Sequence, residues 1–138
     1  MPDYRSFEHT ADIGIEAWGK DLAELLANAG RALFDVAVDL STVRPLEAME
    51  IELEAYDAPL LLHDWLSELL YLFTAKQRVA CAFEFSEISE KRLRATVRGE
   101  KFDDARHHLK TDIKAVTYHQ LEAKREVDGW YARAILDL

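Results

Sequence analysis

Hydrophobic and polar residues alternate in several stretches of the chain, the pattern of a strand with one buried face. In the first of these stretches Ile13, Ile15 and Ala17 alternate with Gly14, Glu16 and Trp18. The same alternation predicts three further strands, at 49–55, 81–85 and 93–97. The last two predict a strand pair, with Arg92, Arg94 and Arg98 forming a basic stripe on its outer face. We expect this face to be solvated, with a partner contact as the alternative.

Two other stretches repeat hydrophobic residues at intervals of three and four, which is typical of amphipathic helices. The first is predicted to run from Asp21, a favourable N-cap, to about Leu40, and Glu24 stands where a capping box places its acid. The second begins near Asp57 and Pro59. Its broad apolar face consists of Leu62, Trp65, Leu66, Leu69 and Phe73.

The strongest local signal is a hairpin close to the last residues. Asp128-Gly129 lies between two alternating runs and predicts a two-residue turn with Val127 opposite Trp130 on the core side. Strands and helices together indicate an α+β fold, with two amphipathic helices packed on a mainly antiparallel β-sheet. We expect residues 1–138 to form a single domain.

Charge and composition restrict the function. The 138 residues include 17 basic and 26 acidic ones, a net charge of −9, which argues against a stand-alone nucleic-acid binder. No apolar run approaches the roughly 20 residues of a membrane span. The one cysteine, Cys81, excludes an internal disulfide framework and is interpreted as a buried apolar group, so we expect a cytoplasmic location.

Several familiar active sites are missing from the sequence. The five glycines form neither a dinucleotide-binding turn nor a P-loop, and no serine lies in a nucleophile elbow. No two histidines have the i, i+4 spacing of a metalloprotease. His107 and His108 are neighbours in a charged segment, where we expect a solvated turn.

The last two residues offer carboxylates. The predicted hairpin register puts Asp137 on the polar face opposite Gln120, and Leu138, with its α-carboxylate, opposite His119. Adjacent carboxylates repel unless a basic side chain or a hard cation lies between them, and two of them cannot fill the shell of such a cation, so a third acid is needed. A frayed, solvated terminus is the alternative.

Five stretches in order along nearly the whole chain resemble the archease family. They are EHTADIG, LANAGRALFDV, WLSELLYLF, IKAVTYH and WYARAILDL. The resemblance implies a non-catalytic cofactor of the RNA-splicing ligase that joins RNA 3′-phosphate and 5′-hydroxyl ends in tRNA splicing. It implies that the protein promotes guanylylation and multiple turnover of that ligase, and meets RNA only through it.

The resemblance also implies a metal site formed by Asp12, Asp137 and Leu138, with calcium as the usual ion. The oxygen-only donor set is consistent with this, because it suits Ca²⁺, Mg²⁺ or Mn²⁺ better than zinc. Supporting roles are expected for His9, which could instead tie down its turn, and for Lys114, which could instead be a surface lysine. His119 is expected to orient the terminus.

Two other functions remain open at this point. A small metal-dependent hydrolase could use the same carboxylates, although no general base is evident beyond His9 or His119. A chaperone-like module that modulates RNA- or DNA-modifying enzymes would need no metal at all.

Overall fold

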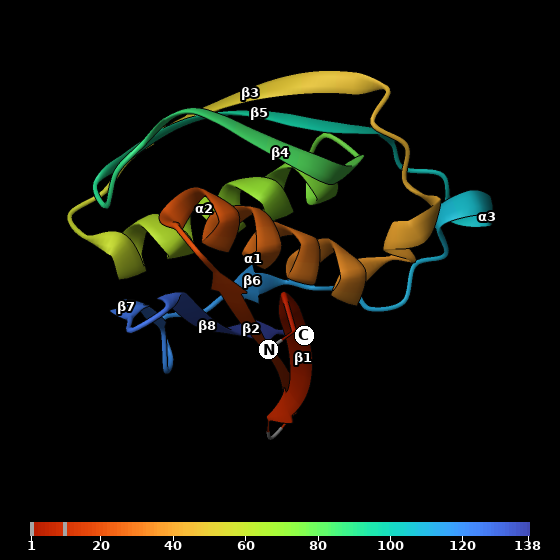
Figure 1. Cartoon of the computed structure of the whole chain (residues 1–138). Helices are drawn as coiled ribbons and strands as arrows, with labels where there is room; N and C mark the ends of the chain where they lie inside the picture. The colour runs from red at the N-terminus through yellow and green to blue at the C-terminus, as the bar shows by residue number, and fades with distance from the viewer. Residues whose placement is uncertain (1, 10) are drawn as a thin grey trace.

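The computed structural model describes residues 2–9 and 11–138, and in it two long helices lie between two antiparallel sheets (Figure 1). The predicted α+β class, with helices packed on antiparallel β-structure, is confirmed. The strands divide into one sheet on each side of the helices, an arrangement that lets both helices bury apolar residues on two faces.

The five-stranded sheet brings both ends of the chain together. β2 lies between β1 and β8, and β8 also pairs with β6 near its end and with β7 near its start. All of these pairings are antiparallel. The strands of this five-stranded sheet are β1 (Tyr4–His9), β2 (Asp12–Gly19), β6 (Ala115–Val116), β7 (Glu122–Glu126) and β8 (Gly129–Asp137).

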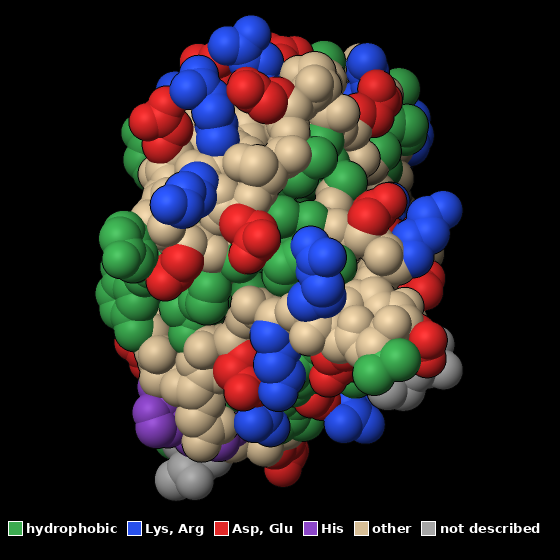
Figure 2. Space-filling model, turned by 60° about the vertical axis from the view of Figure 1, so that its left-hand side comes forward, with side chains coloured by type: hydrophobic (Ala, Val, Ile, Leu, Met, Phe, Trp, Pro, Cys, Tyr) green, Lys and Arg blue, Asp and Glu red, His purple; other side chains and the backbone are tan. Residues whose placement is uncertain are grey.

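The three-stranded sheet has the order β3-β5-β4, formed by β3 (Glu47–Glu54), β4 (Arg78–Ile88) and β5 (Arg92–Lys101). The arginines of the predicted basic stripe are paired with glutamates: Arg92 with Glu54 and Glu87, Arg94 with Glu52, and Arg98 with Glu84. Figure 2 shows acidic and basic side chains next to one another at the upper end, where Figure 1 places this sheet. Such neutralised pairs make a poor phosphate-binding surface.

The helix starts are the predicted ones. Asp21 caps the first helix by accepting from the Glu24 N–H at 2.9 Å, and Asp57 caps the second. The first helix ends at Ala37, before the predicted Leu40, which lies instead in a short 3-10 turn. The helices are α1 (Leu22–Ala37), η1 (Leu40–Thr42), α2 (Ala58–Thr74) and α3 (Asp104–His107). None in the described part of the chain is long and apolar enough to cross a membrane.

The core lies between the two sheets and is centred on α1 and α2. Trp65 of α2 is fully buried, and its indole N–H donates to the Leu26 carbonyl of α1 at 2.8 Å, which fixes the two helices against each other. Cys81 is half-buried against this core. Burial raises the pKa of its thiol, which favours the predicted apolar role over that of a nucleophile.

The terminal hairpin turns one residue earlier than predicted. Glu126 pairs with Gly129, so the turn residues are Val127 and Asp128, and Val127 is 99% exposed. The predicted pairing of Val127 with Trp130 is therefore wrong. Gly129 has φ of 150° and lies against the β2 end, where a Cβ would come within 2.3 Å of the Gly19 carbonyl oxygen. Glycine is thus required by this close approach.

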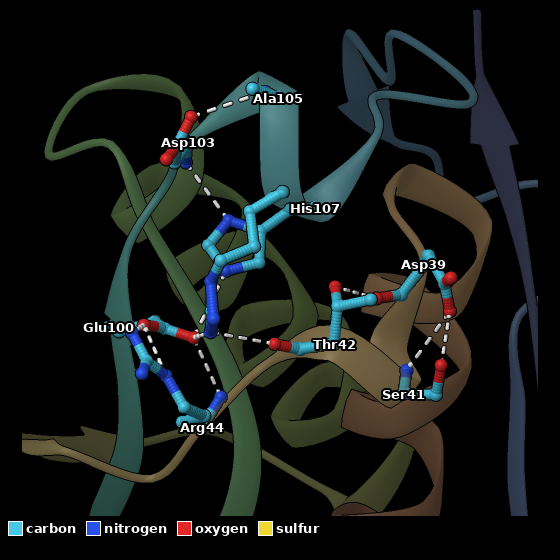
Figure 3. A network of polar contacts seen from close by, with 9 residues as sticks. Asp39, Ser41, Thr42, Arg44, Glu100, Asp103, Ala105 and His107 are labelled. Carbon is cyan, nitrogen blue, oxygen red and sulfur yellow. Dashed lines mark hydrogen bonds and ion pairs between the residues drawn. The ribbon is translucent and has the colours of Figure 1, made fainter.

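A buried ionic network holds α3 and the segment after η1 against β5 (Figure 3). The Glu100 carboxylate accepts from the Arg44 backbone and guanidinium, from Arg106 at 2.6 Å and from His107 Nε2 at 3.0 Å. The Asp103 N–H donates to His107 Nδ1, which fixes the ring tautomer. His107 is fully buried, so its predicted place in a solvated turn is wrong, whereas His108 is exposed.

Glu100 is charged because the hydrogen bonds that it accepts lower its pKa by more than burial raises it. Burial by itself would raise the pKa of Glu100, but the hydrogen bonds around it lower the pKa from 4.5 to about 2. A carboxyl whose pKa is lower in the folded state stabilises the fold above its unfolded pKa, and this stabilisation is lost as the pH falls toward the folded value.

Replacement of Glu100 by glutamine should therefore remove a pH dependence as well as stability. Between pH 4.5 and pH 2 the wild-type protein is expected to lose roughly 2 to 3 kcal/mol of unfolding free energy through this group. Urea unfolding at a series of pH values would measure the loss. The exposed Glu90→Gln variant should keep the wild-type slope, and an unchanged slope in Glu100→Gln would contradict this account of the network.

Candidate metal centre

The β2–β8 register brings the two predicted aspartate ligands together. Ile13 pairs with Leu136, and one step further along the same register Asp12, the first residue of β2, comes opposite Asp137, the last of β8. Directly opposite residues of antiparallel strands direct their side chains to the same face, with Cβ atoms about 5 Å apart. Both carboxylates therefore share the sheet face that points away from the helices.

Leu138 follows directly and is held by packing. Its side chain is half-buried against the core, a contact that disfavours fraying of the last residue. Asp137 is fixed on its other side by β6, where it pairs with Ala115 and its carbonyl accepts from the Lys114 N–H at 2.8 Å. The predicted pairings of Asp137 with Gln120 and of Leu138 with His119 are wrong, because β6 takes up this part of β8.

His9 lies next to Asp12 across the β1–β2 turn. The two residues pair at the end of the hairpin, and His9 Nδ1 is 3.9 Å from the Asp12 carboxylate, beyond hydrogen-bonding range. This Nδ1 is buried and has no hydrogen-bond partner among the described residues. Ala11 in the turn has φ of 67°, a strained value for alanine. Thr10 lies outside the described residues.

His119 reaches the same end of the sheet by a different route. Its ring centroid is 5.4 Å from that of His9, and its backbone N–H donates to the Thr117 hydroxyl. Figure 2 shows histidine side chains together at the lower edge of the molecule, at the level of the β1–β2 turn in Figure 1. The structure thus brings His119 close to His9. Lys114 is exposed and adjoins Asp137 through its backbone.

Glu16, a third acid on this face, is paired with donors, in contrast to the two aspartates. Glu16 is buried and accepts from Arg5 Nε at 2.6 Å and from the Tyr131 hydroxyl at 2.5 Å. Among residues 2–9 and 11–138, neither Asp12 nor Asp137 receives a side-chain hydrogen bond or an ion pair shorter than the 3.9 Å contact with His9. On this face, therefore, Glu16 is paired with donors from the described part of the chain, whereas Asp12 and Asp137 are not.

The pKa values around Glu16 reflect this pairing. Burial would raise the pKa of Glu16, but hydrogen bonds from Tyr131 and Arg5 lower it overall. Burial and the bond to Glu16 raise the pKa of the Tyr131 hydroxyl above its ordinary value, so it stays a donor. Glu16 is thus a fixed negative charge engaged within the sheet, and it does not provide a free ligand.

The donor set of the outer acids suits a hard cation. Asp12, Asp137 and the Leu138 α-carboxylate offer oxygens only, which Ca²⁺, Mg²⁺ and Mn²⁺ prefer. Among the described residues no three His, Cys, Asp or Glu side chains are grouped for metal binding. The two aspartate carboxylates fit such an ion chemically.

The residues that support this site could not be predicted from the sequence. The Phe7 ring covers Gly14, where a Cβ would come within 2.1 Å of the ring, and the Arg133 guanidinium lies 5.1 Å from the same ring. Arg133 Nε is buried without a partner among the described residues. The outward positions of β2 carried the available signal, since Gly14 and Glu16 alternate with core residues. Only the pairings of β2 with β1 and β8 show what covers them.

A family model described as the Archease protein family (MTH1598/TM1083) matches residues 4–138. Among curated relatives, protein archease from Methanosarcina acetivorans is 42% identical over 139 residues, covering 98% of this chain and 95% of its own. The archease of Methanopyrus kandleri is 39% identical with both chains fully covered.

Solved structures agree with this fold. The solution structure of protein 1598 from Methanobacterium thermoautotrophicum is 36% identical, has a TM-score of 0.83 and covers all of both chains. The crystal structure of an archease from Thermotoga maritima has a TM-score of 0.65 at 22% identity, covering 97% of this chain and 96% of its own, and supports the fold alone. By sequence and by structure, then, this chain belongs to the archease family.

Proposed function

We propose that this protein activates an RNA-splicing ligase, promoting its guanylylation and turnover through a divalent cation held by Asp12, Asp137 and the Leu138 carboxylate. The observation that carries the proposal is the pair of uncompensated aspartates that β2 and β8 bring to one face. Family membership supports the choice of partner class. Calcium is the proposed ion, with Mg²⁺ or Mn²⁺ as alternatives of the same chemistry.

The role assigned to the site is positioning. When bound, the cation would supply positive charge for phosphate oxygens during GMP transfer to the ligase, a reaction in which charge neutralisation and alignment dominate. The buried Glu16 ion pair and the packed Leu138 side chain hold the strand ends that carry the carboxylates. His9, His119 and Lys114 line the same end and would orient the site or meet the partner.

A non-catalytic role agrees with the Thermotoga relative, which is described as a possible chaperone. A chaperone-like module that modulates RNA- or DNA-modifying enzymes is therefore the second candidate function. It differs in one respect that can be measured, since such a module needs no cation and should tolerate loss of Asp12 or Asp137. A cytoplasmic location, with RNA reached only through the ligase, stays a prediction.

Calcium should stabilise the folded protein through these carboxylates. At a calcium concentration about 100 times its Kd, the stabilisation is about 2.7 kcal/mol, which raises the unfolding midpoint by roughly 5 to 10 °C for a domain of this size. Differential scanning calorimetry with Ca²⁺ and with EDTA would measure this shift.

Asp137→Asn should abolish the calcium shift without lowering the midpoint in EDTA, because it also removes repulsion between neighbouring carboxylates. Glu90→Gln, which removes one exposed charge elsewhere, should keep the full shift. A calcium shift that survives in both Asp12→Asn and Asp137→Asn would place the ion at other residues.

The activator function should depend on the same residues. In a guanylylation assay of the cognate ligase with GTP, substoichiometric protein should increase the turnover number. Asp12→Asn and Asp137→Asn should reduce this stimulation at least about tenfold, by analogy with the loss of metal-orienting groups, and Glu90→Gln should stimulate as the wild type does.

A variant with a Gly-Ser extension after Leu138 tests the α-carboxylate, since the extension moves the negative charge away while leaving both aspartates in place. It should fold with the wild-type midpoint in EDTA and stimulate poorly. Full stimulation by this variant would remove Leu138 from the site, and full stimulation by both aspartate variants would favour the chaperone-like function.

A further inference from the structure

A hollow next to the terminal hairpin lies at the other end of β2 and β8 from the aspartates. It has a volume of about 580 Å³ and runs between the β7–β8 turn and the start of α1. We call it the tryptophan groove, because Trp18 and Trp130 line it. The acids that line it are Asp3, Glu24, Glu126 and Asp128.

The groove is preformed by close backbone contacts. Gly129 lies so near to Gly19 that a Cβ on Gly129 would come within 2.3 Å of the Gly19 carbonyl oxygen, and a Cβ on Gly19 would come within 2.4 Å of the Leu25 nitrogen. Trp130 is buried as well, with 8% of its surface exposed. The hairpin, β2 and α1 are therefore locked together around the groove, and a ligand would not have to order it.

The electrostatics of the groove favour a cationic ligand. Four of its described lining residues carry carboxylates, and Lys20 carries the single ammonium among them. Glu24 is held in place by the Lys20 N–H at 3.0 Å, and the other three acids, at 3, 126 and 128, have no ion pair among the described residues. This contrasts with the three-stranded sheet, where arginines and glutamates neutralise each other.

Both tryptophan rings make cation–π contacts with arginines of the chain. The Arg125 guanidinium lies 5.3 Å from the Trp130 ring centroid, and that of Arg5 lies 5.7 Å from the Trp18 ring. Cation–π contacts of this kind favour arginine and lysine side chains over aromatic faces. A second hollow lies between α1 and β4, where Phe83 and Phe85 line it. It shares Asp3 and Glu24 with the groove and is also lined by Arg31.

We propose that the tryptophan groove binds a lysine- and arginine-bearing segment of a partner protein. The acidic lining favours a basic ligand by charge complementarity, and the half-buried Trp18 ring offers an aromatic face beside it. RNA is excluded as the occupant because its phosphates would face the four carboxylates.

The groove is separate from the aspartate pair. Asp12 and Gly19 begin and end β2, a separation of about 23 Å at 3.3 Å per residue. A partner that engages both ends would be held by two contacts on opposite ends of one sheet, and binding at the groove requires no cation. Loss of peptide binding at the groove can therefore be distinguished from loss of the proposed activator function at the aspartates.

A titration of the ¹⁵N-labelled full chain with the peptide acetyl-Lys-Arg-Lys-Arg-amide, followed by NMR in EDTA, tests the proposal. The shifts should concentrate in the backbone N–H groups of Gly19, Lys20, Glu126 and Gly129 and in the two indole N–H groups of the groove. The neutral peptide acetyl-Gln-Gln-Gln-Gln-amide should cause none. Shifts centred on Asp12 and Asp137, or spread evenly over the acidic surface, would overturn the proposal.

Charge reversal supplies the second measurement. The double variant Asp3→Lys/Glu126→Lys should weaken the peptide Kd at least about fivefold. Its matched control, Glu84→Lys/Glu90→Lys, changes net charge equally on the β4–β5 hairpin and should bind as the wild type does. Equal weakening in both double variants would reduce the binding to net charge and overturn the assignment of the groove.

Discussion

The antiparallel pairing of β2 with β8 is the constraint on which the rest of the molecule depends. It joins residues near the two ends of the sequence over seven consecutive pairs, from Ile13 with Leu136 to Gly19 with Trp130. One face of this pair closes the core beneath the helices, and the other carries the acids. A shift by one residue would exchange the two faces, so the apolar residues that bury the core also set the positions of Asp12 and Asp137.

Compensation of charge distinguishes the structural acids from the candidate functional ones. Glu100 and Glu16 are buried, and each is surrounded by donors that lower its pKa. Asp12 and Asp137 lie at the strand ends without comparable donors among the described residues. We propose that a cation from solution compensates these two carboxylates, because neighbouring carboxylates without donors repel each other.

Local signals in the sequence predicted local structure well. The cap at Asp21 and the face of Asp137 followed from patterns a few residues long. Contacts between distant segments could not be predicted in this way. The buried His107 ring bonds to the Glu100 carboxylate of β5. The hairpin register depends on the close approach of Gly129 to the Gly19 backbone. His119 lies beside His9 because β6, and not the end of β7, pairs with the end of β8.

The central claim is that a divalent cation lies between the carboxylates of Asp12, Asp137 and Leu138. Crystals grown with Mn²⁺ and measured at the manganese absorption edge test it most directly. The account predicts an anomalous peak about 2.2 Å from oxygens of all three residues. A peak at other acids, or Lys114 forming an ion pair with Asp137 in place of a manganese ion, would contradict it.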